Sequence, residues 1–148
     1  MMGADLRNIK PEMRELLTNK ELISIDQDRE CRPPFLVNKD FVYVEHEDKE
    51  NATEPLRRLD DQLFTFIKHL SDNEFVIAFY NLFEEESDIT CIFADVGLPF
   101  SSGYGFSMKD IFTGEELGVK RDYFTAAVLG HDCRLYRCRL VNCNDGGN

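Results

Sequence analysis

Two pairs of aspartates are the residues of this chain whose types and spacing come nearest to acid–base chemistry. Asp60 and Asp61 are adjacent, and Asp26 and Asp28 are separated by one residue. Paired carboxyl groups act as acid and base only when both reach the same substrate. Adjacent strand residues point to opposite faces, so Asp60 and Asp61 do not converge if that segment is extended. We therefore predict no catalytic residue here.

The three histidines offer no stronger catalytic candidate. His69 lies in an expected strand, His46 in an acidic loop, and His131 at the turn before the last expected strand. A histidine base activates a serine or cysteine nucleophile held in a strained turn, and the sequence shows no such turn. We interpret each histidine as structural or solvated.

The cysteine pattern argues against a metal site and against a disulfide framework. The five cysteines are Cys31, Cys91, Cys133, Cys138 and Cys143. They lack CxxC spacing and a histidine partner pattern, so the sequence predicts no bound metal. An odd number of scattered thiols suits a reducing compartment. No signal peptide is visible, and we therefore predict a cytoplasmic location.

The charge balance excludes other partner classes. A net charge of −11 argues against nucleic-acid binding, which depends on clustered Lys and Arg. Arg134, Arg137 and Arg139 do cluster, but they alternate with apolar residues and are interpreted as a solvated strand face. The acidic run at 46–50 is interpreted as a solvated loop. No apolar run approaches the length of a bilayer, so we predict no membrane partner.

A β-hairpin over residues 63–81 is the strongest structural signal. Residues 63–70 are rich in β-branched and aromatic types, residues 71–74 have turn chemistry, and residues 74–81 are again extended. The second arm is apolar on both faces, which is typical of a covered, central strand. The hairpin therefore predicts a packed β-domain.

Further short strands follow at regular spacing. They are predicted at 41–45, 89–93, 106–112, 123–128 and 134–141. Ile89, Cys91 and Phe93 share one face, so Cys91 is predicted to be a core residue. Gly103-Tyr104-Gly105 has no following helix and is interpreted as a loop instead of a phosphate site. The pattern is typical of a mainly β, antiparallel sandwich of about eight strands and Greek-key type.

The first residues differ from this sheet and predict two short helices. Pro11 lies where a first helical turn tolerates proline, although Lys10 is a poor N-cap. A second helical turn is predicted over residues 19–25. The first helix carries an apolar stripe made of Met13, Leu16 and Leu17. Helices this short are stable only if they pack on another element.

The same N-terminal residues carry a resemblance to a known family. The chain contains, in order, Asp5-Leu6-Arg7, Pro11, Asn19-Lys20-Glu21 and Asp26-Gln27-Asp28. This order resembles the end of the catalytic barrel in α-galactosidases of glycoside hydrolase family 27. Lys109 to Gly114 resembles a later V-x-D-L-W/F-T-x segment of that family, and His131 to Arg139 resembles its closing H-G-x-x-L-Y-R strand.

The resemblance implies a domain organisation and an activity. Residues 1–30 would be a remnant of the last strand and helix of a truncated (β/α)₈ barrel, residues 31–141 a β-sandwich domain, and residues 142–148 a disordered tail. The full enzyme would hydrolyse terminal α-galactosyl residues with retention, with a galactoside as substrate and no metal or cofactor. The β-domain would pack beside the barrel.

The resemblance also places the catalytic carboxylates outside this chain. A retaining glycoside hydrolase needs two carboxyl groups, which in this family lie on barrel strands upstream of the segment that residues 1–5 resemble. We therefore predict no catalytic and no substrate-binding residue, and an inactive chain when it stands alone. Asp5 and Arg7 are predicted to be structural, as an ion pair or a turn-capping pair.

Three positions depart from the family pattern. Cys31 and Asp132 stand where the family usually has glycine, and Lys10 replaces a capping serine. If the backbone needs positive φ at Cys31 and Asp132, their Cβ atoms cost stability.

Two other functions remain open at this point. The chain could be a carbohydrate-binding module in which Tyr104, Phe106 and Tyr123 stack on sugar rings, although it contains no tryptophan. It could instead dock on a separate barrel through the Met13, Leu16 and Leu17 stripe, which predicts an exposed apolar patch.

Overall fold

The computed structural model describes residues 9–45 and 56–144. Asp5 and Arg7, the acidic run at 46–50 and residues 145–148 of the predicted tail therefore lie outside the described residues. The elements are α1 (Pro11–Leu17), α2 (Lys20–Asp26), β1 (Phe35–Glu45), β2 (Leu56–His69), β3 (Glu74–Asn81), β4 (Ser87–Ile92), the 3₁₀ helix η3 (Phe93–Val96), β5 (Tyr104–Asp110), β6 (Glu116–Lys120), β7 (Tyr123–Val128) and β8 (Asp132–Asn142). Within these ranges, no helix combines the length and apolar character needed to cross a bilayer.

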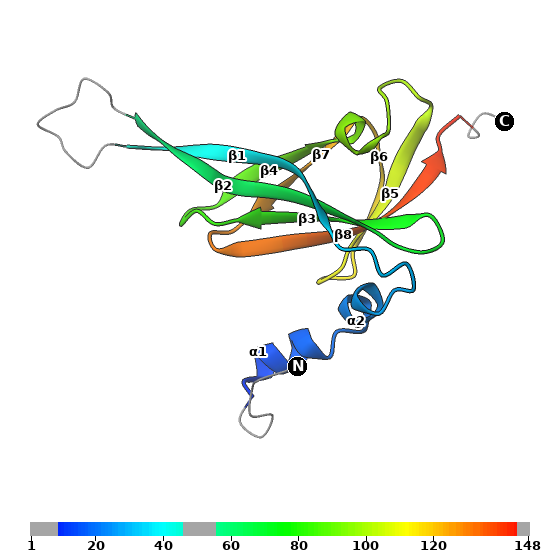
Figure 1. The fold of residues 1–148 in the computed structure, drawn as a ribbon, viewed down its shortest axis with the longest axis horizontal. Coiled ribbons are helices and arrows are strands. Elements are labelled where there is room, and N and C mark those ends of the chain that lie inside the picture. Colours follow the sequence, from blue (N-terminus) through cyan, green and yellow to red (C-terminus); the bar gives the residue numbers. More distant parts are fainter. Residues whose placement is uncertain (1–8, 46–55, 145–148) are drawn as a thin grey trace, which may run out of the picture.

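The strands form two antiparallel sheets, as Figure 1 shows. The larger sheet has the order β1-β2-β3-β8-β5-β6, and the smaller one contains β4 and β7. The chain leaves the larger sheet after β3 and after β6, and β8 returns to pair between β3 and β5. This confirms the predicted mainly β, antiparallel sandwich. The predicted hairpin is β2–β3, and β3 has the central position expected of a strand that is apolar on both faces.

The core fills the space between the two sheets. The side chains of Ile77, Phe79, Phe93, Met108 and Val128 are all 0% exposed. Edge-to-face aromatic pairs connect the layers, with ring centroids 4.7 Å apart for Phe93 and Phe106. Cys91 lies in this cluster, which confirms the prediction that it is a core residue.

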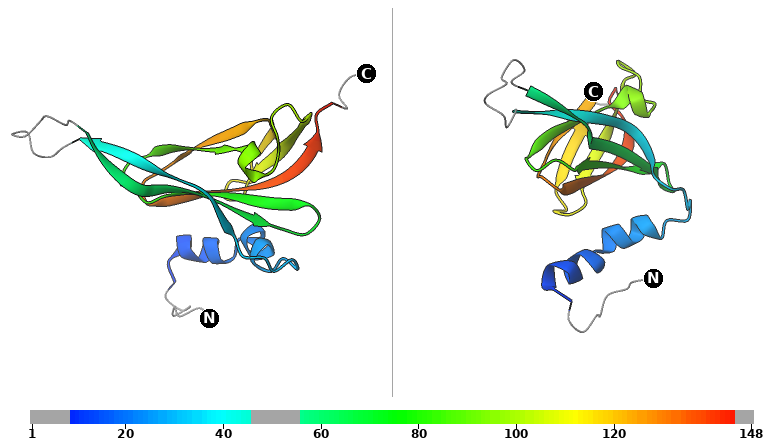
Figure 2. Two further views of the ribbon diagram at one scale, coloured as in Figure 1. Left: turned by 45° about the horizontal axis from the view of Figure 1, so that its top comes forward. Right: turned by 60° about the vertical axis from the view of Figure 1, so that its left-hand side comes forward.

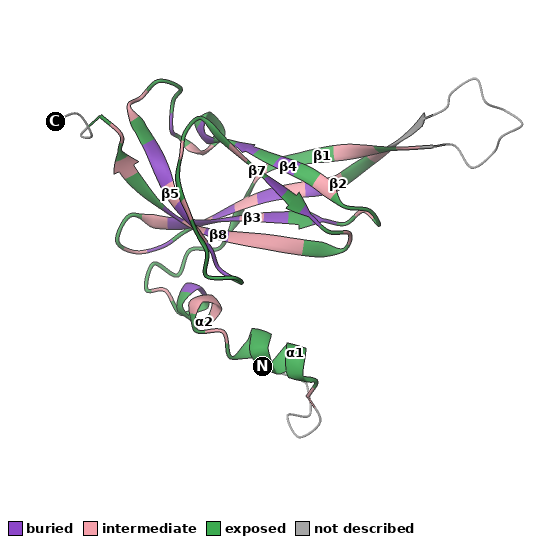
Figure 3. Ribbon diagram, turned by 180° about the vertical axis from the view of Figure 1, so that it is seen from behind, coloured by how far each residue is buried: buried purple, intermediate pink, exposed green. Residues whose placement is uncertain are grey.

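The outer face of the larger sheet carries the helical segment. Ile25 of α2 belongs to a second apolar cluster with Leu70, Val76 and Ile111. Figure 2 shows both helices on the side of the larger sheet that faces away from β4 and β7. In Figure 3 part of α2 is buried, whereas α1 is exposed along its length. Only α2 is thus fastened to the sandwich within the described residues.

Several strands differ from the sequence expectation: β2 begins at Leu56 instead of Leu63, and β4 ends at Ile92, with Phe93 in η3. β1 begins at Phe35 instead of Phe41, because Phe35 pairs opposite Ile67 and the long β2 offers partners along the whole segment. β6 was not predicted, since it is short, contains Gly118 at φ 70° and is mostly exposed. It forms because β5 presents a free edge to it.

Candidate functional site

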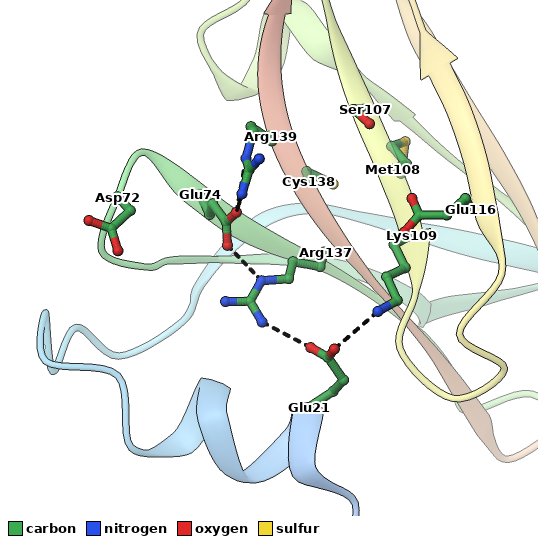
Figure 4. A pocket seen from close by; sticks show the side chains of 10 residues that line it. All are labelled: Glu21, Asp72, Glu74, Ser107, Met108, Lys109, Glu116, Arg137, Cys138 and Arg139. Atoms are coloured by element: carbon green, nitrogen blue, oxygen red, sulfur yellow. Dashed lines mark hydrogen bonds and ion pairs between the residues drawn. The ribbon is translucent and has the colours of Figure 1, made fainter.

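Helix α2 is held in place by its N-cap and by one apolar face. The Asn19 side chain accepts hydrogen bonds from the backbone N–H groups of Glu21, at 2.9 Å, and Leu22, at 3.2 Å. Leu22 and Ile25 pack on the outer face of the larger sheet. This arrangement directs the Glu21 side chain toward β5 and β8, as Figure 4 shows.

Glu21 belongs to a chain of ion pairs that runs from Lys109 to Arg139, which we call the Glu21 clamp. Its members are Glu21, Glu74, Lys109, Arg137 and Arg139. Glu21 accepts from Lys109 Nζ at 3.1 Å and from Arg137 Nη1 at 2.9 Å. Arg137 Nε donates to Glu74 at 2.7 Å, and Arg139 also pairs with Glu74. The clamp therefore joins α2 to β3, β5 and β8 (Figure 4).

The electrostatics favour the charged form of every clamp group whose pKa is shifted. The hydrogen bond from Lys109 lowers the pKa of Glu21, with Arg137 adding to it and burial opposing it. Burial raises the pKa of Glu74, but hydrogen bonds from Arg139 and Arg137 outweigh that effect and lower it. Burial lowers the pKa of Arg137, and its bonds to Glu74 and Glu21 more than reverse this.

The cleft around the clamp has a volume of about 500 Å³ and is also lined by Asp72, Ser107 and Glu116. Both clamp carboxylates are already engaged by cations, so neither is free to act as a nucleophile or base. The clamp residues therefore fix one element against another. This positioning role is the chemistry that the arrangement supports.

An apolar groove of about 380 Å³ lies beside α2 on the same outer face. It is lined by Ile25, Pro34, Phe66, Val76, Ala78, Tyr80 and Leu135, with the Lys68 stem. Phe66 and Tyr80 meet edge to face with centroids 5.7 Å apart. Partial burial raises the pKa of Tyr80, which is still 39% exposed. We refer to these residues as the apolar groove.

The aspartate pairs do not meet on a common site. Asp28 instead accepts from the Ser71 backbone N–H at 2.9 Å and from its hydroxyl at 2.7 Å, which ties the loop after α2 to the β2–β3 turn. Asp61 is ion-paired with Lys39 at 2.8 Å. The prediction for Asp5 and Arg7 falls outside the described residues.

The interpretation of the arginine cluster as a solvated face is wrong for Arg137. Its side chain is 29% exposed and lies between Glu21 and Glu74. The strand itself was predicted, but alternation cannot show that a helix covers that face. A usable signal was present, because Glu21, Lys109 and Arg137 each lie in a segment that resembles a family motif.

All five cysteines are free. Burial raises the pKa of Cys91 to about 12, so this thiol stays protonated. Among the described residues, no group of three potential ligands is placed to hold a metal ion. The cytoplasmic location stays a prediction.

The structure also tests the predicted turn positions and the stacking residues. Cys31 has φ 50°, as expected where the family has glycine, whereas Asp132 is extended strand and the left-handed residue is His131, with φ 55°. Phe106 is only 4% exposed and cannot stack on a sugar, while Tyr123 is exposed.

The fold and the Glu21 clamp together define an antiparallel β-sandwich that carries a helical segment on the outer face of its larger sheet. The model of the family described as alpha galactosidase C-terminal beta sandwich domain matches residues 60–138. The chain belongs to this family.

Individual relatives agree with that assignment. Alpha-galactosidase 3 of Arabidopsis thaliana is 27% identical over 137 residues, which cover 92% of this chain and 27% of that protein. Alpha-galactosidase I from Mortierella vinacea has a TM-score of 0.72 at 21% identity, covering 93% of this chain and 30% of that one. The Saccharomyces cerevisiae alpha-galactosidase with raffinose has a TM-score of 0.73 at 13% identity, covering 95% and 40%. At these identities the solved structures establish the fold, and the chain spans less than half of each relative's length.

Proposed function

We propose that this chain serves as the barrel-packing C-terminal portion of a retaining, α-galactosidase-like glycoside hydrolase. The whole protein would cleave terminal α-galactosyl residues from galactosides. Family membership and the motif order over residues 5–28 support this proposal. The 148 residues alone are not expected to catalyse the reaction, because the resemblance places the two catalytic carboxyl groups on barrel strands and only residues 1–30 resemble the barrel.

The observation that carries the proposal is the Glu21 clamp. It fastens α2, the part of the chain that resembles the end of a catalytic barrel, to three strands of the sandwich. Ion pairs that are partly shielded from solvent fix orientation through their directional geometry. The clamp would therefore set the angle at which the barrel and the sandwich meet.

The partner proposed for the outer face is the catalytic barrel. The apolar groove lies next to α2, and the α1 stripe of Met13, Leu16 and Leu17 is exposed at 50%, 45% and 37%. Neighbouring apolar surfaces of this kind mark interaction sites.

Activity of the isolated chain tests the catalytic half of the proposal. The purified 148-residue chain should release no nitrophenol from nitrophenyl α-galactoside. Release that disappears when a carboxylate within this chain is mutated would show that the chain has its own active site. An immunoblot of lysate and medium from the source cells, with an antibody against residues 64–139, measures the size of the native polypeptide. A band several-fold larger supports a tail of an intact enzyme.

Association with a barrel tests the docking half. The barrel portion of the Arabidopsis thaliana relative, co-expressed with this chain, should co-purify with it. Leu16→Asp together with Leu17→Asp should abolish co-purification, because charges on the stripe oppose burial. The matched control is Leu129→Asp, an exposed leucine in the turn between β7 and β8. Equal co-purification of both variants would show that the stripe is not part of the interface with the barrel.

A further inference from the structure

A second cleft lies where β6, β7 and β8 approach one another at the edge of the sandwich. Its volume is about 910 Å³. The residues that matter for its chemistry are Val119, Lys120, Arg121, Tyr123, Thr125 and Asn142. None of them belongs to the Glu21 clamp or to the apolar groove. The cleft is therefore separate from the surface proposed for the barrel.

The cleft exists because the chain changes sheets in two residues. Arg121 and Asp122 connect β6 of the larger sheet to β7 of the smaller sheet. Asp122 has φ 64°, and its carbonyl accepts from the Phe93 N–H at 2.8 Å, which pins the corner to η3. Arg121 donates to the carbonyl of Cys143 at 3.2 Å and so holds the end of β8 against the corner.

Three of the lining residues, Val119, Lys120 and Cys143, pack closely on Gly105 of β5. A Cβ on the buried Gly105 would lie 2.6 Å from the Lys120 carbonyl oxygen, 2.9 Å from Val119 Cγ1 and 3.1 Å from Cys143 Sγ. Strands β5, β6 and β8 therefore approach closely here, as glycine permits. On the other wall, the Phe124 ring packs inward on Tyr136 with centroids 4.9 Å apart. The cleft is preformed on both sides.

The surface chemistry of the cleft differs from that of the rest of the molecule. The chain has 28 acidic and 17 basic residues, yet the described lining holds Lys120 and Arg121 and no carboxylate. Tyr123, beside them, is 60% exposed and presents its ring to solvent. Asn142 and Thr125 add polar groups at the rim.

This combination matches one ligand class. An aromatic ring stacks on the apolar C–H face of a sugar, and cations bind carboxylates through charge-assisted hydrogen bonds. Asn142 and Thr125 can bind the hydroxyl groups of any sugar, whereas Lys120 and Arg121 favour one that also carries a carboxylate. We propose that the β6–β7–β8 cleft binds an acidic sugar, a pyranose that carries a carboxylate. This binding does not depend on hydrolytic activity or on barrel docking, so it stands or falls independently of the proposed function.

An NMR titration of the 148-residue chain tests the proposal, with galacturonate, galactose and inorganic phosphate as separate probes. Galacturonate should shift resonances of Tyr123, Lys120 and Asn142 with a dissociation constant of about 1 mM, as expected for one pyranose in an open cleft. Tyr123→Ala should weaken binding about tenfold through lost stacking. Lys120→Gln should weaken it about threefold and reduce its dependence on salt.

The controls are residues of the same type elsewhere on the surface. Tyr43→Ala removes an exposed tyrosine of β1, and Arg29→Gln removes an exposed cation, and neither should change the affinity. Equal affinity for galactose and galacturonate would overturn the proposal, because the cations would then play no part. Equal shifts with phosphate, unaffected by Tyr123→Ala, would show an anion site without sugar recognition. No shift at the cleft would overturn it as well.

Discussion

At the scale of single residues, the two carboxylates of the Glu21 clamp share Arg137 but differ in exposure. The Glu74 side chain is 11% exposed and the Glu21 side chain 35%. Solvent screens the Glu21 pairs, so Glu21→Gln should cost at most about 1 kcal/mol of unfolding free energy. Glu74→Gln leaves two guanidinium groups without their shared carboxylate and should cost about 1–3 kcal/mol. Urea unfolding measures both, with Glu86→Gln as the exposed control. Equal losses at positions 21 and 74 would contradict the ranking.

The pH dependence of stability follows from the same two groups. In the folded chain the pKa of Glu21 and that of Glu74 lie below their ordinary value of 4.5. As pH falls, these two carboxylates therefore take up protons at a higher pH in the unfolded chain than in the folded chain. The clamp contributes its full stability above about pH 4.5 and loses it as pH falls through the lowered pKa values of the folded chain. The melting temperature should fall on acidification below pH 4.5. The variant with Gln at both positions should show a flatter decline between pH 5 and pH 3, and an unchanged slope would exclude the clamp as its origin.

Cys31 and Asp132 give a matched test of backbone strain. Cys31 occupies the left-handed region, where a Cβ costs about 1–2 kcal/mol, while glycine adds about 0.5–1 kcal/mol of unfolded-state entropy. Cys31→Gly should therefore be neutral to stabilising, by up to about 1 kcal/mol. Asp132 is extended in β8, so Asp132→Gly should destabilise by about 0.5–1 kcal/mol. Thermal unfolding of both variants gives the comparison, and a stabilising Asp132→Gly would contradict it.

The residue-level predictions from sequence succeeded where the cause is local. Ile89, Cys91 and Phe93 alternate toward one face, and that alternation places them in the core. The prediction that Arg137 is solvated failed because its partner Glu21 lies 116 positions away in the chain. A strand pattern reports which face a side chain takes, but it does not report which distant element covers that face.

At the scale of elements, helix α2 depends on its cap. It has 7 residues, too few for stability without tertiary contacts. Asn19→Ala removes the acceptor of two backbone N–H groups and should cost about 1 kcal/mol. Hydrogen exchange should show faster exchange in α2 while β3 and β8 keep their protection. Loss of protection throughout the sandwich would mean that α2 and the sheets unfold as one unit.

An element could be predicted when its own residues carried a clear strand or turn pattern. The hairpin β2–β3 carries dense β-branched and aromatic residues with turn chemistry at Asp72 and Asn73, and both of these have positive φ. β6 carries little such signal, with Gly118 in its centre, and exists because β5 offers an edge. The start of β1 at Phe35 likewise reflects pairing with β2 instead of local preference.

At the scale of the whole molecule, Gly130 is a point where two connections touch, because the β7–β8 turn lies against the backbone of the β3–β4 turn there. A Cβ there would fall inside van der Waals contact of the Glu84 carbonyl and 3.0 Å from the Phe83 carbonyl oxygen. Gly130→Ala should therefore destabilise by about 1–3 kcal/mol or more through backbone displacement. Gly114→Ala is the control, because its Cβ meets nothing within 4 Å and its only cost is the backbone strain of an alanine at φ 74°. Circular dichroism melts should rank Gly130→Ala as the more damaging change.

The sheet order itself lay beyond the sequence argument. The placement of β8 between β3 and β5 joins residues up to 65 positions apart, as in the pairing of Glu74 with Arg139. Such contacts depend on the closure of long loops and leave no short-range pattern. Strand spacing and the family resemblance both predicted the sandwich, whereas the strand order and the charged face beneath α2 are seen only in the structure.

The two buried thiols of this molecule are natural reporters of how often the sandwich opens. Cys91 and Cys138 lie inside the sandwich, and burial raises the pKa of both, whereas Cys31 is exposed. A thiol-labelling reagent should modify Cys31 at once and reach the other two only during excursions in which the sheets separate. The labelling rate of Cys91 and Cys138 therefore times the spontaneous opening of the sandwich without any engineered probe. Binding of a barrel or a sugar would slow that rate by the factor by which it stabilises the closed molecule.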